Sequence, residues 1–233
     1  MRETIVKLAE ALGLYKWLMA IDTRRQMRRQ NRAFARYGLE TLAQAEAAAA
    51  ECGAHLFLAF GSLLGAYREK GFIPFDCDLD TGLLATERSE AFLSAMKRHG
   101  FDYLRQYYVK ATGRVCEEKF SYRGVHLDVH YFYPTPDGGL GCELCLPHET
   151  KSWREANATD GFPSVLRTCC NTTFSAHDFL GVQVYLPDRA EEWLKTLYGE
   201  SFMTPNPNWT MSDHQRLARI EGERLYRRTE AEG

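Results

Sequence analysis

Three carboxylates occur at every second position in one short stretch of the chain. They are Asp76, Asp78 and Asp80, at the end of the segment FGSLLGAYREKGFIPFDCDLD that begins at Phe60. Alternate side chains of a β-strand point to one face, so this spacing predicts three acids on a shared surface. Carboxylates this close repel, and a divalent cation neutralises them. Because the donors are all oxygens, Mg²⁺ or Mn²⁺ is expected, and these ions also hold substrate phosphates. The alternative interpretation is a solvated acidic turn.

A turn of small residues precedes the acids and follows an apolar run. Gly61 allows the backbone to approach a phosphate closely, and Ser62 offers a hydroxyl donor. Arg68 follows in the same segment. Its guanidinium suits a pyrophosphate, although an ion pair with Glu69 is the alternative. We therefore predict that Gly61, Ser62 and Arg68 bind the phosphates of a nucleotide.

These residues resemble the signature of a known family. The blocks GSLLGAYR from Gly61 and GFIPFDCDLD from Gly71 look like the signature of the LicD/fukutin family. The block HLDV from His126 resembles a later strand of that family. The block LPDRAEEWLKTLYGESFMTPNPNW from Leu186 resembles its C-terminal pattern. The matches occur in the family's order, from about Tyr37 onwards.

The resemblance implies both a fold and an activity. The family consists of phosphotransferases with a nucleotidyltransferase fold, which move a phosphoalcohol from a CDP-linked donor to a glycan. We therefore expect a metal-dependent enzyme that transfers a phosphocholine-, ribitol phosphate- or glycerol phosphate-like group to a cell-surface glycan or glycolipid and releases CMP. One alternative is a nucleotidyltransferase that adds NMP to a small molecule and releases pyrophosphate. Another is a non-catalytic scaffold that binds glycans or is organised by zinc.

The resemblance also assigns roles to individual acids. It implies that Asp78 and Asp80 bind the metal from the first strand and that Asp128 is the third metal carboxylate. Asp76 either binds the metal or supports a residue that does. Since the third acid of this fold can also act as a base, Asp128 is the expected base for the acceptor hydroxyl. Catalytic roles are therefore expected for Asp78, Asp80 and Asp128.

Asp128 and its neighbours have other interpretations. Asp128 lies in an apolar strand, where an ion pair with Arg114 or Arg123 would also explain it. His126 and His130 flank it on the same face of that strand. The two histidines could bind a transition metal, support the carboxylate or contact the acceptor. A purely structural role is the alternative.

The chain contains seven cysteines. Cys142 and Cys145, together with Cys169 and Cys170, could form a Cys₄ zinc site. This pattern is weaker than two C-x-x-C knuckles, and buried free thiols explain the residues more simply. An odd number of cysteines is typical of a reduced, cytosolic protein. We therefore expect Mg²⁺ or Mn²⁺ as the cofactor and do not favour structural zinc.

Composition limits the class of protein and its partners. The chain has 233 residues, 45% of them hydrophobic, and a net charge of −2. It can bury one good core, and it carries no net positive charge that would attract nucleic acid. No apolar run is long enough to predict a transmembrane helix. A signal peptide is not expected, because no small-residue cleavage site follows an apolar core near the N-terminus. The expected localisation is cytoplasmic, with the inner face of the membrane as a second expectation.

The N-terminal segment is basic. One interpretation is a peripheral membrane contact through an amphipathic helix, near a lipid-linked glycan acceptor. The other is a helix that packs on the domain and exposes its arginines to solvent. No acidic residue occurs between Asp22 and Glu40. The arginines of this segment are Arg24, Arg25, Arg28, Arg29, Arg32 and Arg36.

The pattern of helices and strands predicts an α/β (α+β) fold. The family resemblance further implies a nucleotidyltransferase-like mixed β-sheet with flanking helices and an N-terminal helical extension. The expected divisions are a basic amphipathic helix over 1–36, a catalytic domain over 37–211 and a charged helix over 212–233. Strands are expected near 55–60, 76–80, 101–109, 115–122, 125–133 and 179–186. Helices are expected over 39–52, 63–70, 87–99, 190–198 and 212–228, and an irregular, cysteine-rich region over 140–172.

Overall fold

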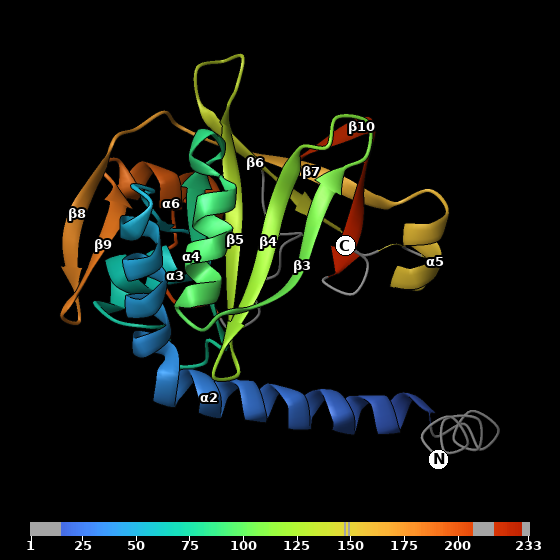
Figure 1. Cartoon of the computed structure of the whole chain (residues 1–233), viewed down its shortest axis with the longest axis horizontal. Coiled ribbons are helices and arrows are strands. Elements are labelled where there is room, and N and C mark those ends of the chain that lie inside the picture. Colours follow the sequence, from blue (N-terminus) through green and yellow to red (C-terminus); the bar gives the residue numbers. More distant parts are fainter. Residues whose placement is uncertain (1–14, 147, 149, 207–216, 230–233) are drawn as a thin grey trace.

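The computed structural model describes residues 15–146, 148, 150–206 and 217–229. This part of the chain forms one mixed sheet with helices packed on both faces (Figure 1). The expected mixed α/β fold is therefore confirmed. The helices are α2 (Tyr15–Glu51), α3 (Phe60–Leu64), α4 (Glu90–Arg98), α5 (Trp153–Ala158) and α6 (Ala190–Tyr198), with a π-helical turn, η1 (Gly65–Glu69), and a 3-10 turn, η2 (Ala85–Glu87). The strands are β1 (Phe57–Leu58), β2 (Asp78–Leu84), β3 (Asp102–Val109), β4 (Val115–Tyr122), β5 (Val125–Pro134), β6 (Leu140–Cys145), β7 (Phe162–Cys169), β8 (Phe174–Phe179), β9 (Val182–Pro187) and β10 (Leu217–Thr229).

The strands follow the order β4-β3-β10-β7-β6-β5-β2-β1-β9-β8, and β4 also pairs with β5. The pairings from β5 through β4, β3, β10, β7 and β6 therefore close into a ring. On the far side of β5, β2 runs parallel to it and leads to β1, β9 and β8. Strand β5 thus lies where the ring and the open part of the sheet meet, so residues of both parts can reach its side chains.

The two faces of β5 differ in chemistry, because successive side chains of a strand point in opposite directions. Leu127, Val129 and Tyr131 are fully buried. Helices α2 and α4 cover this apolar face, and Phe92 of α4 makes an edge-to-face contact with Phe120 of β4. The opposite face of β5 carries His126, Asp128 and His130, on the side of the sheet where α3 and α6 pack. The apolar face forms the core and leaves the polar face for a functional site.

Most expected elements are confirmed. Strands β3, β4 and β5 lie where strands were predicted over 101–109, 115–122 and 125–133. Helix α4 begins after Ser89, whose hydroxyl accepts a hydrogen bond from the Phe92 backbone N–H at 3.2 Å. A serine in this position satisfies one of the unpaired N–H groups of the first turn. Helix α6 ends where Gly199 adopts a positive φ of 83°.

Two expectations are wrong. The region 140–172 is not irregular, because it contains β6, α5 and β7, and β6 and β7 pair with each other. The charged segment expected to be a helix over 212–228 contains strand β10, which pairs with β3 on one side and β7 on the other. Pairing on both edges satisfies the strand's backbone hydrogen bonds, and this tertiary gain outweighs its helical propensity. Leu225 of β10 is fully buried. Residues 212–216 lie outside the described residues.

Helix α2 crosses the boundary that was expected at residue 36, because Tyr15–Glu51 is one helix. Its first part extends along the lower edge of the domain in Figure 1, and its last turns pack beside α4. Phe34 is buried, whereas Arg25 to Arg29 are exposed. The first part of the helix expected over 1–36, residues 1–14, lies outside the described residues. No described helix has the length and apolar character needed to span a bilayer.

Glu46 of α2 is expected to make the stability of the domain depend on pH. Burial raises the pKa of Glu46 to about 8, from 4.5 in an exposed chain. Because the folded state holds this proton more tightly than the unfolded state, it loses stability as the pH rises from about 4.5 to about 8. Each pKa unit corresponds to about 1.4 kcal/mol.

Glu46→Gln removes the ionisation, so the free energy of unfolding should increase by at least ~1 kcal/mol at pH 8 and change little at pH 4. Urea unfolding at both pH values measures this. The matched control is Glu90→Gln, at an exposed position of α4. Equal stability of Glu46→Gln and the parent at pH 8 would contradict the expectation.

Candidate active site

The acids predicted to act together lie side by side on neighbouring strands. Strands β2 and β5 are parallel, with Asp78 opposite His126 and Asp80 opposite Asp128. On the other edge of β5, Lys119 of β4 stands opposite Asp128. Residues opposite one another on adjacent strands share a face of the sheet. The fold therefore brings Asp78, Asp80 and Asp128 together, as the sequence predicted.

The small-residue turn is bonded directly to Asp80. The Gly61 N–H donates to Asp80 Oδ2 at 3.2 Å, and the Asp80 N–H donates to Ser62 Oγ at 2.9 Å. A Cβ atom at position 61 would lie 3.2 Å from Asp80 Oδ2, so a side chain there would crowd the carboxylate. Gly61 and Ser62 thus position Asp80, and the phosphate contact expected of them stays a prediction.

Asp76 reaches the site by a different route from the one expected. Strand β2 begins at Asp78, so the expectation that all three acids share one strand is wrong for Asp76. Its N–H donates to Ile73 O at 3.0 Å in the preceding turn. The turn still brings Asp76 Oδ2 to 3.6 Å from the position a Cβ of residue 61 would take, beside Asp80. Asn31 of α2 holds the turn through a 3.0 Å hydrogen bond to Phe75 O.

The acids repel one another in the absence of a counterion. Burial, followed by the charges of Asp80 and Asp78, raises the pKa of Asp76 to about 7. Burial and the charges of Asp80 and Asp128 raise the pKa of Asp78 to about 6. An ionised carboxylate that is buried beside others is unfavourable without a cation. The site is therefore arranged to receive positive charge.

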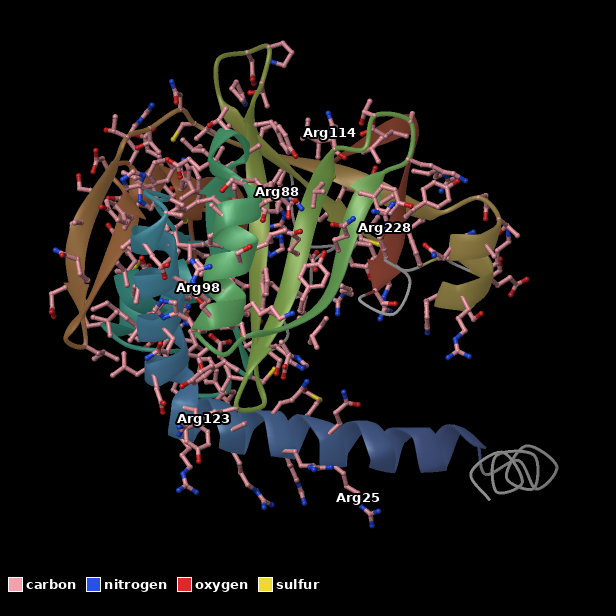
Figure 2. The ribbon with its side chains drawn as sticks, viewed as in Figure 1. Arg25, Arg88, Arg98, Arg114, Arg123 and Arg228 are labelled. Atoms are coloured by element: carbon pink, nitrogen blue, oxygen red, sulfur yellow. The ribbon has the colours of Figure 1, made fainter. Side chains whose placement is uncertain are left out.

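Asp128 has one paired oxygen and one unpaired oxygen. Its Oδ2 lies 2.8 Å from Lys119 Nζ, and both side chains are nearly buried. Its Oδ1 is buried and has no hydrogen-bond partner. The expected alternative partners are wrong, because Arg114 pairs with Glu143 and Glu223 and Arg123 pairs with Glu40. Figure 2 shows Arg123 at the turn between β4 and β5, beside α2.

Arg68 forms the ion pair that was the alternative to phosphate binding. Its Nε lies 2.7 Å from Glu69 Oε1, and its Nη1 donates to Phe202 O at 3.0 Å. The guanidinium is nevertheless near the acids, because its positive charge lowers the pKa of Asp76 and so opposes part of the increase caused by burial. Its predicted role with phosphate stays a prediction.

The two histidines beside Asp128 have different surroundings. His126 Nδ1 lies 3.1 Å from Gln30 Nε2 of α2, and burial lowers the pKa of His126. His130 Nε2 lies 3.8 Å from Asp80 Oδ1. Burial opposes protonation of His130, but Asp80 and Glu117 outweigh it and raise the pKa of His130. The ring of His130 also contacts the ring of Phe60 edge-to-face, with 4.8 Å between centroids.

Three further residues at the site were not predicted from the sequence. Phe60 has a positive φ of 41°, an unusual conformation for a residue other than glycine, next to the Gly61 turn. Arg167 of β7 stacks on the Phe60 ring at 5.4 Å. Tyr198 of α6 lies near Asp80 and Arg167, and burial raises its pKa. Arg167 belongs to the region expected to be irregular, so the sequence offered no signal for it.

The cysteines do not form the Cys₄ set considered from the sequence. Cys142 and Cys145 stand three positions apart on β6, so they face opposite sides of the strand. Cys142 and Cys169 are both buried and lie near each other. Burial is the main cause of the raised pKa of Cys142, and the nearby thiol of Cys169 raises it further. All seven cysteines are free.

A cleft of about 1030 Å³ opens beside the acids. It lies between the start of β6, the end of β7 and helix α6, and Thr168, Cys169 and Tyr198 line it. The acids themselves do not line the cleft. Tyr198 connects the two regions, because it faces the cleft and also lies near Asp80.

The donor chemistry of the residues present fits a divalent cation. Within the described residues, no group of three or more His, Cys, Asp or Glu side chains is placed so that it could hold a metal ion. The unpaired Oδ1 of Asp128 and the raised pKa values of Asp76 and Asp78 nevertheless indicate missing positive charge. Carboxylate oxygens are the donors preferred by Mg²⁺ and Mn²⁺. Asp78, Asp80 and Asp128 are the residues that this chemistry favours for such an ion.

Comparisons with known proteins give a family match. The LicD/FKTN/FKRP nucleotidyltransferase domain matches residues 53–188, which include β2, β5 and the turn at Gly61. The curated relative ribitol-5-phosphate transferase FKTN of Mus musculus is 23% identical over 165 residues, covering 68% of this chain and 32% of the relative. The Homo sapiens FKTN is 24% identical over 183 residues, covering 76% of this chain and 35% of the relative. The chain thus spans about one third of the length of these relatives.

One solved structure is similar at a lower level. It is the lincomycin-bound lincosamide antibiotic adenylyltransferase LnuA, with a TM-score of 0.39 and 11% sequence identity. The similarity covers 66% of this chain and 82% of that protein.

Proposed function

This chain belongs to the LicD/FKTN/FKRP family, and from that membership we propose that it transfers a phosphoalcohol from a CDP-linked donor to a hydroxyl of a glycan. The relatives are named as ribitol-5-phosphate transferases. The proposal extends that class of reaction to this chain, with a phosphocholine-, ribitol phosphate- or glycerol phosphate-like group as cargo. The proposed acceptor is a cell-surface glycan or a lipid-linked glycan, and no nucleic acid is involved.

In the proposed reaction, the acceptor hydroxyl attacks the phosphorus that carries the alcohol. A new O–P bond forms, the P–O bond to CMP breaks, and CMP leaves with the electron pair. We assign the proton of the hydroxyl to the unpaired Oδ1 of Asp128, which has no hydrogen-bond partner. Lys119 holds the other oxygen at 2.8 Å and so fixes the orientation of the carboxylate. Such orientation is the main contribution that proteins make to phosphoryl transfer.

The proposed metal site consists of Asp78, Asp80 and Asp128, with Mg²⁺ or Mn²⁺ as the ion. A metal ion bound there would neutralise the charge that develops on the transferred phosphoryl group. The N–H of Gly61 and the hydroxyl of Ser62 hold Asp80 in place. Asp76 supports the site from the preceding turn or binds the metal itself.

The observation that carries this proposal is the register of β2 and β5, which places Asp80 beside Asp128 on one face. Thermal denaturation with Mg²⁺ and a panel of CDP-choline, CDP-ribitol, CDP-glycerol and CDP-ethanolamine tests it. At a hundred times its Kd, a ligand stabilises the folded protein by about 2.7 kcal/mol. We expect one CDP-alcohol to raise the Tm and to yield CMP when a glycan acceptor is added. Release of pyrophosphate from a nucleoside triphosphate, with no response to any CDP-alcohol, would instead identify a nucleotidyltransferase.

The exposed arginines of α2 are proposed to contact anionic lipid headgroups at the inner face of the membrane. Figure 2 shows Arg25 pointing away from the body of the domain. None of the described acids forms an ion pair with Arg25, and no acid lies between Asp22 and Glu40 in the sequence. A basic surface near a membrane gains about 1 kcal/mol per arginine. Contact there would place the enzyme near a lipid-linked acceptor.

Combined replacement of Arg25, Arg28 and Arg29 by Gln is expected to weaken binding to phosphatidylglycerol vesicles by roughly 100-fold. Co-sedimentation at low salt measures the binding. Gln replacements of Arg98 and Arg154, which are exposed on α4 and α5, provide the matched control. Unchanged vesicle binding by the α2 variant would show that this helix does not contact the membrane.

A further inference from the structure

Arg167 is a buried guanidinium without a carboxylate partner. It lies on β7, is 4% exposed, and its Nε has no hydrogen-bond acceptor. Arg88, Arg105, Arg114 and Arg227 also have an unpaired buried Nε. The first three form ion pairs with glutamates, and Arg227 is only half-buried, over the ring of Trp153 at 4.3 Å. Arg167 forms no ion pair among the described residues. Because burying a charge is unfavourable unless it is paired, its surroundings are those of an anion site whose anion comes from elsewhere.

The surroundings of Arg167 hold its side chain firmly. The guanidinium lies over the ring of Phe60 at 5.4 Å, and that ring also contacts His130 at 4.8 Å and Phe132 at 6.4 Å. The backbone of Phe60 has a φ of 41°, which costs energy in a residue other than glycine. Strain of this kind persists where a site requires it. The ring of Phe60 therefore contacts both Arg167 and His130, and His130 Nε2 lies 3.8 Å from Asp80 Oδ1.

The position of Arg167 also connects it to the cleft. Thr168 and Cys169, the next residues of β7, line the cleft, and Tyr198 lines it as well. Tyr198 interacts with both Arg167 and Asp80. Arg167, Asp80 and Asp76 do not line the cleft themselves, but each of them lies near Tyr198, which does. An anion between them would face the guanidinium on one side and the metal-binding carboxylates on the other.

We infer that Arg167 binds a phosphate group of the nucleoside-diphosphate-linked donor. A guanidinium offers paired donors that match two phosphate oxygens, which a single ammonium cannot do. A metal ion on the acids and Arg167 on β7 would then hold the two phosphates from opposite sides. The identity of the anion as a donor phosphate rests on the proposed transfer reaction, whereas the anion site itself follows from the burial and isolation of Arg167.

The test uses the whole protein and inorganic pyrophosphate as the probe, measured by calorimetry with and without Mg²⁺. We expect Arg167→Met to weaken pyrophosphate binding by at least ~10-fold and Arg167→Lys to recover only part of the loss. Arg98→Met is the matched control, because Arg98 is exposed on α4, on the opposite face of the sheet. The same replacement there should leave binding unchanged.

A stability measurement separates an anion site from a structural role. Without an anion, Arg167→Met removes an unpaired buried charge, so its Tm should stay equal to that of the parent or rise. A structural arginine would lower the Tm when replaced. The inference fails if the parent does not bind pyrophosphate, if Arg167→Met binds it as tightly, or if its Tm falls.

The transfer assay distinguishes this inference from the proposed function. If pyrophosphate binding depends on Arg167 but the protein transfers no phosphoalcohol, the anion site is supported and the proposed transfer reaction is wrong. If the Arg167→Met variant transfers the phosphoalcohol with an unchanged KM for the donor, the proposed transfer reaction is supported and the role of Arg167 is wrong. We expect the KM for the donor to rise by at least ~10-fold in this variant.

Discussion

Replacing Asp78, Asp80 or Asp128 by Asn is expected to reduce phosphoalcohol transfer by at least ~10³-fold, equivalent to about 4 kcal/mol of transition-state stabilisation. Each replacement keeps the size of the side chain and removes a negative charge from the proposed metal site. Chelation by EDTA should likewise abolish transfer, and Mg²⁺ or Mn²⁺ should restore it. Initial rates with the true donor measure the effect.

The three replacements should differ in stability, which separates catalysis from folding. Asp78→Asn relieves repulsion within the acid cluster, so its Tm should stay the same or rise. Asp128→Asn leaves Lys119 without its 2.8 Å ion pair, so its Tm should fall. Asp76→Asn should reduce the rate less if Asp76 only supports the site. Asp102→Asn, at an exposed position of β3, is the control. Parent rates in Asp78→Asn and Asp80→Asn would refute the metal site and the proposed transfer reaction.

Trp193→Ala is expected to destabilise the domain by about 3–5 kcal/mol, the cost typical of removing a large buried aromatic side chain. Trp193 of α6 is fully buried and stacks on Phe132 of β5 with 5.4 Å between ring centroids. It also contacts Phe57 and Phe174 edge-to-face. Its indole N–H donates to Cys170 O at 2.8 Å, so the replacement also leaves a carbonyl unpaired. The residue thus fixes α6, which carries Tyr198, against the sheet.

Urea unfolding measures this change directly, and a domain of this size should lose about 2–4 °C in Tm per kcal/mol. Trp193→Phe is the matched comparison, because it keeps an aromatic ring in the cluster. It loses the hydrogen bond to Cys170 O but only part of the side-chain volume. We expect it to be clearly more stable than Trp193→Ala. A loss below ~1 kcal/mol in the alanine variant would show that α6 is held by other contacts.

Local patterns alone predicted much of the fold. The aromatic and β-branched residues of 101–109, 115–122 and 125–133 predicted β3, β4 and β5, because such side chains pack well on a pleated sheet. Ser89 and Gly199 marked helix ends, since a capping hydroxyl and a positive φ are local properties. Strand β10 was not predictable in this way. Its charged sequence favours a helix, and only pairing with β3 and β7 makes it a strand.

The candidate site shows the same division. The spacing of Asp76, Asp78 and Asp80 predicted a cluster of acids, because clustered carboxylates repel unless a cation neutralises them. The family resemblance added Asp128 from a later strand, and the role of these acids in metal binding stays a prediction. The sequence could not place Lys119 beside Asp128, give Asp76 its position in a turn, or reveal Arg167. These depend on the register of β4, β5 and β2 and on the curvature that carries β7 across to Phe60. Such contacts join residues far apart in the chain, so only the tertiary structure decides them.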